Sequence, residues 1–191
     1  MGTRTIHAVV TASLVWAWLM MPGSGAAAFA QTAEDQAAAT RTFSERVDRY
    51  VRLRDRLEAP LLPFDGRRDS WSLMLSRRYL ASAIRSARPN AAQGQIFAPP
   101  VGDMFRTLIA QAVYQVDIEG LVSQEPEPSV DLVVNEPVPS WALEPVPGAL
   151  LERLLPLPAG LEYRIVHGSL VLWDVHAEIL IDVLPDAFTG E

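Results

Sequence analysis

The sequence of 191 residues contains no cysteine and no lysine. The absence of cysteine excludes a disulfide scaffold, a thiol nucleophile, a zinc site with cysteine ligands and a lipoprotein anchor cysteine. Hydrophobic residues make up 49% of the chain, which is too much for a protein that stays disordered along most of its length. The length is that of one ordinary domain. We therefore expect a folded domain that does not depend on disulfides.

Sequence motifs of nucleotide-binding and hydrolytic enzymes are absent as well. The glycines at positions 66, 94, 102 and 120 are isolated, so they form no phosphate-binding loop or dinucleotide fingerprint. Ser169 follows Gly168 in an expected hairpin loop, which is not the strained strand-to-helix turn of a hydrolase nucleophile. We predict no catalytic residues and no cofactor.

All sixteen cationic side chains are arginines, and they are unevenly distributed. Residues 31–110 carry thirteen arginines against nine acidic residues, whereas residues 111–191 carry two against fourteen. Because the arginines of the first half are interleaved with acids, we predict no nucleic-acid partner. The opposite net charges predict that the two halves attract each other, either within one chain or between copies.

The first thirty residues have the features of a secretory signal peptide. Arg4 gives the N-terminus a positive charge, residues 8–21 form an apolar run, and Ala28-Phe29-Ala30 fits the small-x-small cleavage pattern. The run is shorter than the ~20 residues that a membrane-spanning helix needs. We predict cleavage after Ala30 and a periplasmic or secreted location. The alternative is an uncleaved leader, which would be the protein's one contact with a membrane.

Residues 31–123 are predicted to form a helical half with three helices. The first runs from residue 32 to Pro60, the second from Asp69 or Ser70 to Ala87, and the third begins at Pro99. Each carries apolar residues at helical spacing, while Arg78 and Arg85 point away from the stripe of the second helix. The expected buried stripes are Phe43, Val47, Tyr50 and Leu57; Leu73, Leu80, Ala83, Ile84 and Ala87; and Val101, Met104, Phe105, Leu108, Ala112 and Val116.

Charged residues of the first helix give two further expectations. Glu45 with Arg49, and Asp48 with Arg52, have the acid-first i,i+4 spacing that stabilises a helix by a few tenths of a kcal/mol. Arg54 falls within the apolar stripe. The favoured interpretation is that its stem packs while its guanidinium reaches water. The alternative is an ion pair with a carboxylate of the acidic half.

The rest of the chain is a proline-rich connector, residues 124–147, and a small β unit, residues 148–191. A strand is predicted at residues 130–134 within the connector, and a short helix opens the β unit. Three-residue hairpin loops are predicted to join three antiparallel strands into a meander. These strands are residues 162–166, 170–175 and 179–184. The predicted fold class is α+β, three N-terminal helices followed by a small antiparallel β-meander with one short helix, and residues 31–191 fold as one domain.

The middle predicted strand is apolar on both faces, so it must be covered on both. We expect helices over one face and the proline segment or a partner chain over the other, with Trp173 in the core. The third strand would lie at a sheet edge, and apolar edges are normally covered. Residues 130–134 are the favoured cover, and the alternative is a dimer in which a second copy pairs with the edge.

From Pro156 onward the chain reads PLPAGLEYRIVHGSLVLWDVHAEILIDVLP. This segment resembles a pattern in uncharacterised secreted proteins of GC-rich bacteria, in which an arginine-rich helical half precedes a similar ending. It is also similar to the C-terminal hairpin of RcnB-type nickel/cobalt homeostasis proteins, where a Pro-Gly turn and an aromatic residue precede two short apolar strands. The second resemblance implies a metal-handling role, although the chain lacks a His-rich or Met-rich tract.

Asp174, His176 and Glu178 alternate along the chain and belong to residue types that bind zinc or nickel. On a regular strand, alternate Cα atoms lie about 6.6 Å apart, which is too far for one ion with ~2 Å bonds to collect all three. The favoured interpretation is that they are polar turn residues, and a metal site is the alternative. Asp174, Asp182 and Asp186 are candidates for acid–base chemistry, but we expect them to be solvated.

These observations favour a non-catalytic secreted or periplasmic protein that binds another envelope component or associates with itself. A periplasmic metal-handling protein is one alternative, built on the three turn residues. A hydrolase of unknown type is the other.

Overall fold

The computed structural model describes residues 24–61, 70–115 and 129–188, with side chains for residues 32–61, 70–112 and 129–188. The apolar run of the leader, the loop around Pro63 and the Pro/Glu linker at residues 124–128 lie outside these ranges. What the sequence predicts for them stays a prediction.

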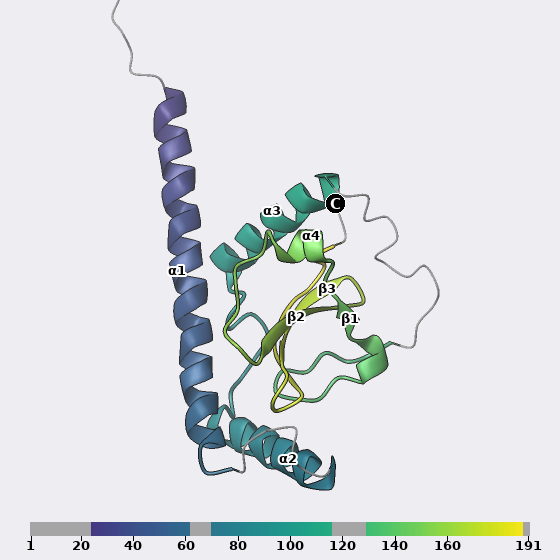
Figure 1. Ribbon diagram of the computed structural model, residues 1–191. Coiled ribbons are helices and arrows are strands. Elements are labelled where there is room, and N and C mark those ends of the chain that lie inside the picture. The colour runs from purple at the N-terminus through teal and green to yellow at the C-terminus, as the bar shows by residue number, and fades with distance from the viewer. Residues whose placement is uncertain (1–23, 62–69, 116–128, 189–191) are drawn as a thin grey trace, which may run out of the picture.

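Three helices occupy the N-terminal half, as predicted (Figure 1). They are α1, Ser24–Glu58, α2, Ser70–Ala87, and α3, Pro99–Gln115. Proline sets two of the boundaries, because it cannot continue α1 past Pro60 and is tolerated at the start of α3. α1 begins before the predicted cleavage site at Ala30 and forms a long rod along one side of the molecule. No helix in the described ranges is long and apolar enough to cross a membrane.

The predicted apolar stripes are largely buried. Phe43, Phe105 and Ile84 are among the most deeply buried side chains of the three helices. Leu57 is only half-buried and Ala87 is exposed, because each lies in the last turn of its helix, where the packing ends. The i,i+4 ion pairs predicted on α1, from Glu45 and Asp48 to the arginines four residues on, are not formed.

The C-terminal half forms a four-stranded antiparallel sheet in the order β1-β2-β3-β4. The strands are β1, Glu144–Pro145, β2, Leu161–Val166, β3, Ser169–Asp174, and β4, Ile179–Leu184. A one-turn 3-10 helix, Ser140–Ala142, precedes β1, and the short helix α4, Gly148–Leu151, separates β1 from β2. The predicted α+β class, with three N-terminal helices and the meander β2-β3-β4, is confirmed.

The hairpin loops differ in length from the prediction. Val166 pairs with Ser169, so the first loop has two residues rather than three. His167 and Gly168 both have positive φ, 46° and 73°, which is the backbone of the type I′ turn that matches the twist of two paired strands. Asp174 pairs with Ile179, so the turn between β3 and β4 has four residues.

The strand predicted at residues 130–134 is not formed. The contact with β4 comes just downstream, where Asn135 donates its N–H to the Leu180 carbonyl at 2.7 Å and Leu180 donates back to Glu136 at 2.9 Å. The pairing stops there because prolines 137 and 139 have no N–H to donate. The chain itself therefore covers this part of the β4 edge.

Two apolar clusters lie on the two faces of the sheet. The larger packs the helices against the face that carries Leu170 and Leu172. The smaller joins Trp173 to Val138 and Ala142 of the connector. The proline segment thus covers the second face, and Trp173, 7% exposed, is a core residue as predicted.

A β-bulge interrupts the pairing of β3 with β4. Leu172 pairs with Asp182 and Trp173 pairs with Leu180, which leaves Ile181 without an opposite residue. The extra residue reverses the alternation of side chains. Val183 consequently joins the connector face, and Asp182 turns toward the loop between α2 and α3.

Candidate functional site

The turn between β3 and β4 contains all three residues of the alternative metal site, but their side chains go to different partners. The Asp174 carboxylate is fully buried. Its Oδ1 accepts the N–H groups of His176 at 2.8 Å and Ala177 at 2.9 Å, and its Oδ2 accepts the Tyr50 hydroxyl at 2.6 Å. Asp174 therefore holds the turn in shape and ties it to α1.

The other two residues connect the turn to two helices. His176 Nδ1 lies 3.0 Å from both carboxylate oxygens of Glu58 on α1. Glu178, at a φ of 53°, forms an ion pair with Arg77 on α2. Across the described ranges, no group of three or more His, Cys, Asp or Glu side chains is placed to hold a metal ion.

The position of Arg54 contradicts the favoured prediction that its guanidinium reaches water. The residue is only 5% exposed. Its Nη1 lies 4.0 Å from Asp174 Oδ2 and donates a hydrogen bond to the Ala159 carbonyl at 3.2 Å. The guanidinium does not reach water freely, and the alternative contact with the acidic half is the one that forms. A buried carboxylate needs a compensating charge, and the apolar stripe of α1 faces the turn that carries Asp174.

The same carboxylate controls Tyr50. Burial raises the pKa of Tyr50 well above its usual range, and the negative charge and hydrogen bond of Asp174 raise it further. The phenol therefore stays protonated and donates. Together these contacts make the turn a rigid support for the surface beside it.

Two of the three candidate acid–base residues are not solvated as expected. Asp182 is fully buried and accepts the N–H groups of Gly94, Ile96 and Phe97 at 2.6, 2.5 and 2.8 Å. Asp174 is committed to the turn in a similar way. Asp186 is exposed, as predicted. Both buried carboxylates therefore organise loops, which explains their position inside apolar strands.

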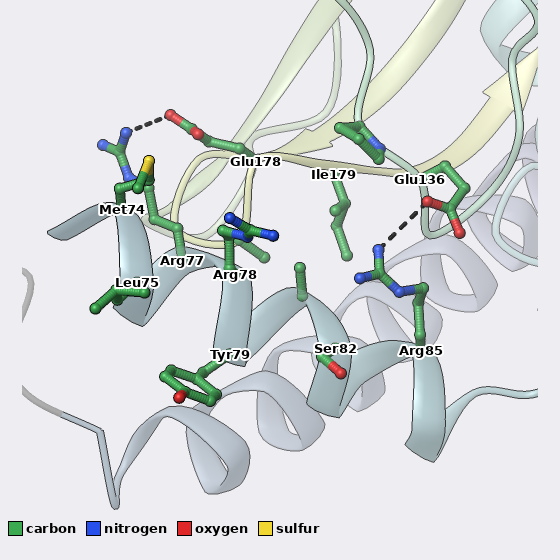
Figure 2. Close-up of a pocket in the computed structure, with 13 residues that line it drawn as sticks. Met74, Leu75, Arg77, Arg78, Tyr79, Ser82, Arg85, Glu136, Glu178 and Ile179 are labelled. Atoms are coloured by element: carbon green, nitrogen blue, oxygen red, sulfur yellow. Dashed lines mark hydrogen bonds and ion pairs between the residues drawn. The ribbon is translucent and has the colours of Figure 1, made fainter. Parts of the chain in front are cut away.

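A groove of about 690 Å³ lies between α2 and the segments at residues 136–137 and 177–179 (Figure 2). We call it the α2 groove. Its α2 wall carries residues spaced three or four apart, which share one helix face. The residues that line it are Met74, Leu75, Arg77, Arg78, Tyr79, Ala81, Ser82, Arg85, Glu136, Pro137, Ala177, Glu178 and Ile179.

Two ion pairs border the α2 groove, and a third arginine lies between them. Arg77 pairs with Glu178, and Arg85 pairs with Glu136 at 3.3 Å. Figure 2 shows Arg78 between these pairs, and it has no ion-pair or hydrogen-bond partner among the described residues. Arg77 Nε is buried without a hydrogen-bond acceptor. Within the part of the chain that the structure describes, Arg78 is thus a groove guanidinium without a carboxylate partner, whereas Arg77 and Arg85 are paired.

Large apolar side chains are exposed on the same helix. Trp71 and Tyr79 are 64% and 65% exposed, and Met74 is 38% exposed. Burying such side chains stabilises a complex by roughly 25 cal/mol per Å² of apolar area removed from water, before the costs of association. The surface suits binding better than bond-breaking chemistry, because the carboxylates that line it are paired with arginines.

Helical spacing predicted Arg78 and Arg85 on the outer face of this helix, but no pattern in the sequence connected them to a site. A sequence signal for this exposed face was present on the helix itself. Trp71, Leu75, Arg78, Ser82 and Arg85 follow the spacing of one face, opposite the buried stripe. The other wall of the groove comes from residues about 50 and 100 positions downstream, and no local pattern reveals that.

The sequence matches no protein-family model and no curated protein. Among solved structures, a similar one is the C-terminal domain of inner membrane protein CigR from Salmonella enterica, with 24% sequence identity and a TM-score of 0.37. The similarity covers 46% of this chain and 90% of that chain. The likeness to RcnB-type proteins stays a prediction from sequence.

Proposed function

We propose that the protein is a non-catalytic component of the cell envelope that binds another protein through the α2 groove. The observation that carries this proposal is that α2 exposes Trp71, Met74 and Tyr79 and also carries Arg78, which has no ion-pair or hydrogen-bond partner among the described residues. The envelope location rests on the signal peptide predicted at residues 1–30.

The composition of this surface supports protein binding. Tryptophan, tyrosine and arginine dominate the residues whose truncation weakens protein–protein complexes most, and methionine is enriched at interfaces. All of these types stand on one helix of 18 residues. A rigid helix presents them with less loss of conformational entropy on binding than a loop would.

The charge pattern indicates the chemistry of the partner. Arg77 and Arg85 are already neutralised by Glu178 and Glu136, whereas Arg78 is not. A partner segment with one carboxylate flanked by apolar side chains would complete the groove. The carboxylate would pair with Arg78, and the apolar groups would cover Trp71 and Tyr79.

Site-specific photo-crosslinking in the producing cell tests the proposal. A photoreactive residue replaces Ser82 in the α2 groove or, as a matched control, the exposed Ser44 on α1. We expect one adduct from position 82 and none from position 44. The purified partner should then bind the full chain, and Arg78→Glu should weaken that binding at least tenfold, while Arg52→Glu on α1 leaves it unchanged.

Equal adducts from both positions would overturn the proposal, because they would show contact without a preferred surface. An adduct with the mass of two copies of this chain would overturn it too, since the groove would then serve self-association.

A further inference from the structure

A second groove, of about 510 Å³, lies between α1, the residue that follows α2, and the loop at residues 95–96. We call it the arginine groove. It shares no lining residue with the α2 groove. Among the described residues, its lining contains four arginines and no acidic residue: Arg46, Arg49, Tyr50, Leu53, Arg56, Arg88, Gln95 and Ile96.

Among the described residues, none of the four arginines forms an ion pair with a carboxylate. Arg46 donates to the Ile96 carbonyl at 3.1 Å, and Arg88 donates to the side-chain oxygens of Asn135 at 2.8 Å and Gln95 at 3.3 Å. Arg49 and Arg56 have no ion-pair or hydrogen-bond partner among the described residues. Elsewhere in the structure, arginines on α1, α2, α3 and β2 do pair with carboxylates.

Arg88 is the most enclosed of the four. Its guanidinium lies 5.2 Å above the centre of the Tyr50 ring and is half-buried. Desolvation lowers the pKa of Arg88 from its ordinary value. The charge of the buried Asp182 carboxylate opposes this shift, but Arg88 forms no ion pair among the described residues. A cation that has lost part of its water gains further from an anion that enters beside it.

The wall opposite α1 is held in place before any ligand arrives. The fully buried carboxylate of Asp182 accepts the backbone N–H groups of Gly94, Ile96 and Phe97. Gln95 is further fixed by donating to the Asn90 carbonyl at 2.9 Å. Binding therefore does not have to order this loop, which reduces its entropic cost.

We propose that the arginine groove binds an anion that carries at least two phosphate groups. The guanidinium fork matches phosphate oxygens with two parallel hydrogen bonds. Arg49 and Arg56 stand two helical turns apart, which is about 10 Å along α1, so each can hold a separate phosphate group of one ligand. A volume of about 510 Å³ also exceeds the needs of a single inorganic phosphate and falls in the range of small-molecule sites.

The same chemistry is available from two sources, the headgroup of a diphosphate lipid or a soluble diphosphate. Calorimetric titration of the full chain with inorganic pyrophosphate tests the soluble source. Co-sedimentation with cardiolipin-containing phosphatidylcholine vesicles tests the lipid source, with pure phosphatidylcholine vesicles as the blank. Both are run at 150 mM salt, where non-specific attraction is largely screened.

Two double variants make the test specific. Arg49→Gln/Arg56→Gln removes two groove charges, and Arg41→Gln/Arg52→Gln removes two exposed charges of α1 that do not line the groove. Net charge changes equally in both. Neither pair of arginines has a described partner, so the fold should persist, which thermal unfolding checks.

We expect saturable binding of pyrophosphate or of the cardiolipin vesicles, weakened at least tenfold by the groove variant and less than twofold by the control. Binding of pyrophosphate identifies a soluble diphosphate as the ligand, and binding of the vesicles identifies a lipid headgroup. The proposal is overturned if neither probe binds, or if both variants weaken binding equally. It is also overturned if a poly-glutamate peptide binds the groove more tightly than pyrophosphate does.

Discussion

Replacement of Asp174 by asparagine tests whether the buried network supports the fold as described. The side chain keeps its shape but loses its charge. Its two oxygens face different groups: Oδ1 receives two backbone N–H groups of the turn, whereas Oδ2 receives the Tyr50 hydroxyl and faces Arg54 at 4.0 Å. An asparagine can satisfy only one of these two sides.

The cost follows from that geometry. With its oxygen toward the turn, Asp174→Asn keeps both backbone hydrogen bonds but loses their charge assistance, about 1 kcal/mol each. Its amide nitrogen then faces Arg54, which is 5% exposed and loses a compensating charge. Removing one partner of a buried pair costs roughly 3–5 kcal/mol, and part of this is spared because Arg54 keeps its contact with Asp55 at 3.0 Å. We expect the free energy of unfolding to fall by about 3–4 kcal/mol in total.

Urea unfolding followed by circular dichroism measures this difference, and the melting temperature should fall by roughly 10 °C. A double-mutant cycle with Arg54→Met adds a stricter check. Because the double variant removes the buried cation together with the anion, it should lose less stability than the two single variants combined. A loss below about 1 kcal/mol for Asp174→Asn, or strict additivity in the cycle, would refute the reasoning.

Three further predictions concern separate features. Gly160→Ala should destabilise the fold by about 1–3 kcal/mol in urea unfolding. The reason is that φ of Gly160 is +83° and the new Cβ would lie 2.7 Å from Arg54 Nη1. Gly148→Ala, whose Cβ meets nothing within 4 Å, is the control. The folded state raises the pKa of Tyr50, and burial raises the pKa of Tyr163 as well. Each phenol therefore contributes stability that is fully present below pH ~10 and falls above it by up to ~1.4 kcal/mol per pH unit. Tyr50→Phe should remove one share of this slope, and an unchanged alkaline profile would contradict the assignment. Mass spectrometry of the exported protein should find Gln31 as its first residue. An intact leader in the membrane fraction would instead favour the alternative, in which the uncleaved leader holds the protein at the membrane.

Local signals predicted most of the secondary structure. α2 ends at Ala87 because the residue before Pro89 is forced out of the helical region, and α3 begins at Pro99 because a proline needs no N–H acceptor there. The strands β2, β3 and β4 were recognisable as short apolar runs between turn residues, whereas the two-residue β1 was not predicted and the run at residues 130–134 forms no strand. In each case the physical cause lies within a few residues of the boundary that it sets.

The candidate sites could not be predicted in the same way. The burial of Asp182 depends on N–H groups more than 80 residues earlier in the chain, and the walls of the α2 groove lie 50 to 100 residues apart in sequence. One local clue was present: a single acid inside the apolar strand ILIDVL must find donors if that strand is buried on both faces. The bulge that turns Asp182 toward those donors has no comparable signature.

The bond between Tyr50 and Asp174 spans 124 positions of the sequence, and this has a consequence for the order of events during synthesis. The apolar stripe of α1 cannot close its core until β3 and β4, which follow all three long helices in the chain, have been made. A nascent chain therefore carries its helices for most of its synthesis without the sheet that they pack on. If residues 1–30 act as the predicted export signal, this dependence of the helices on the sheet would keep the core open while the chain is threaded through a translocation pore.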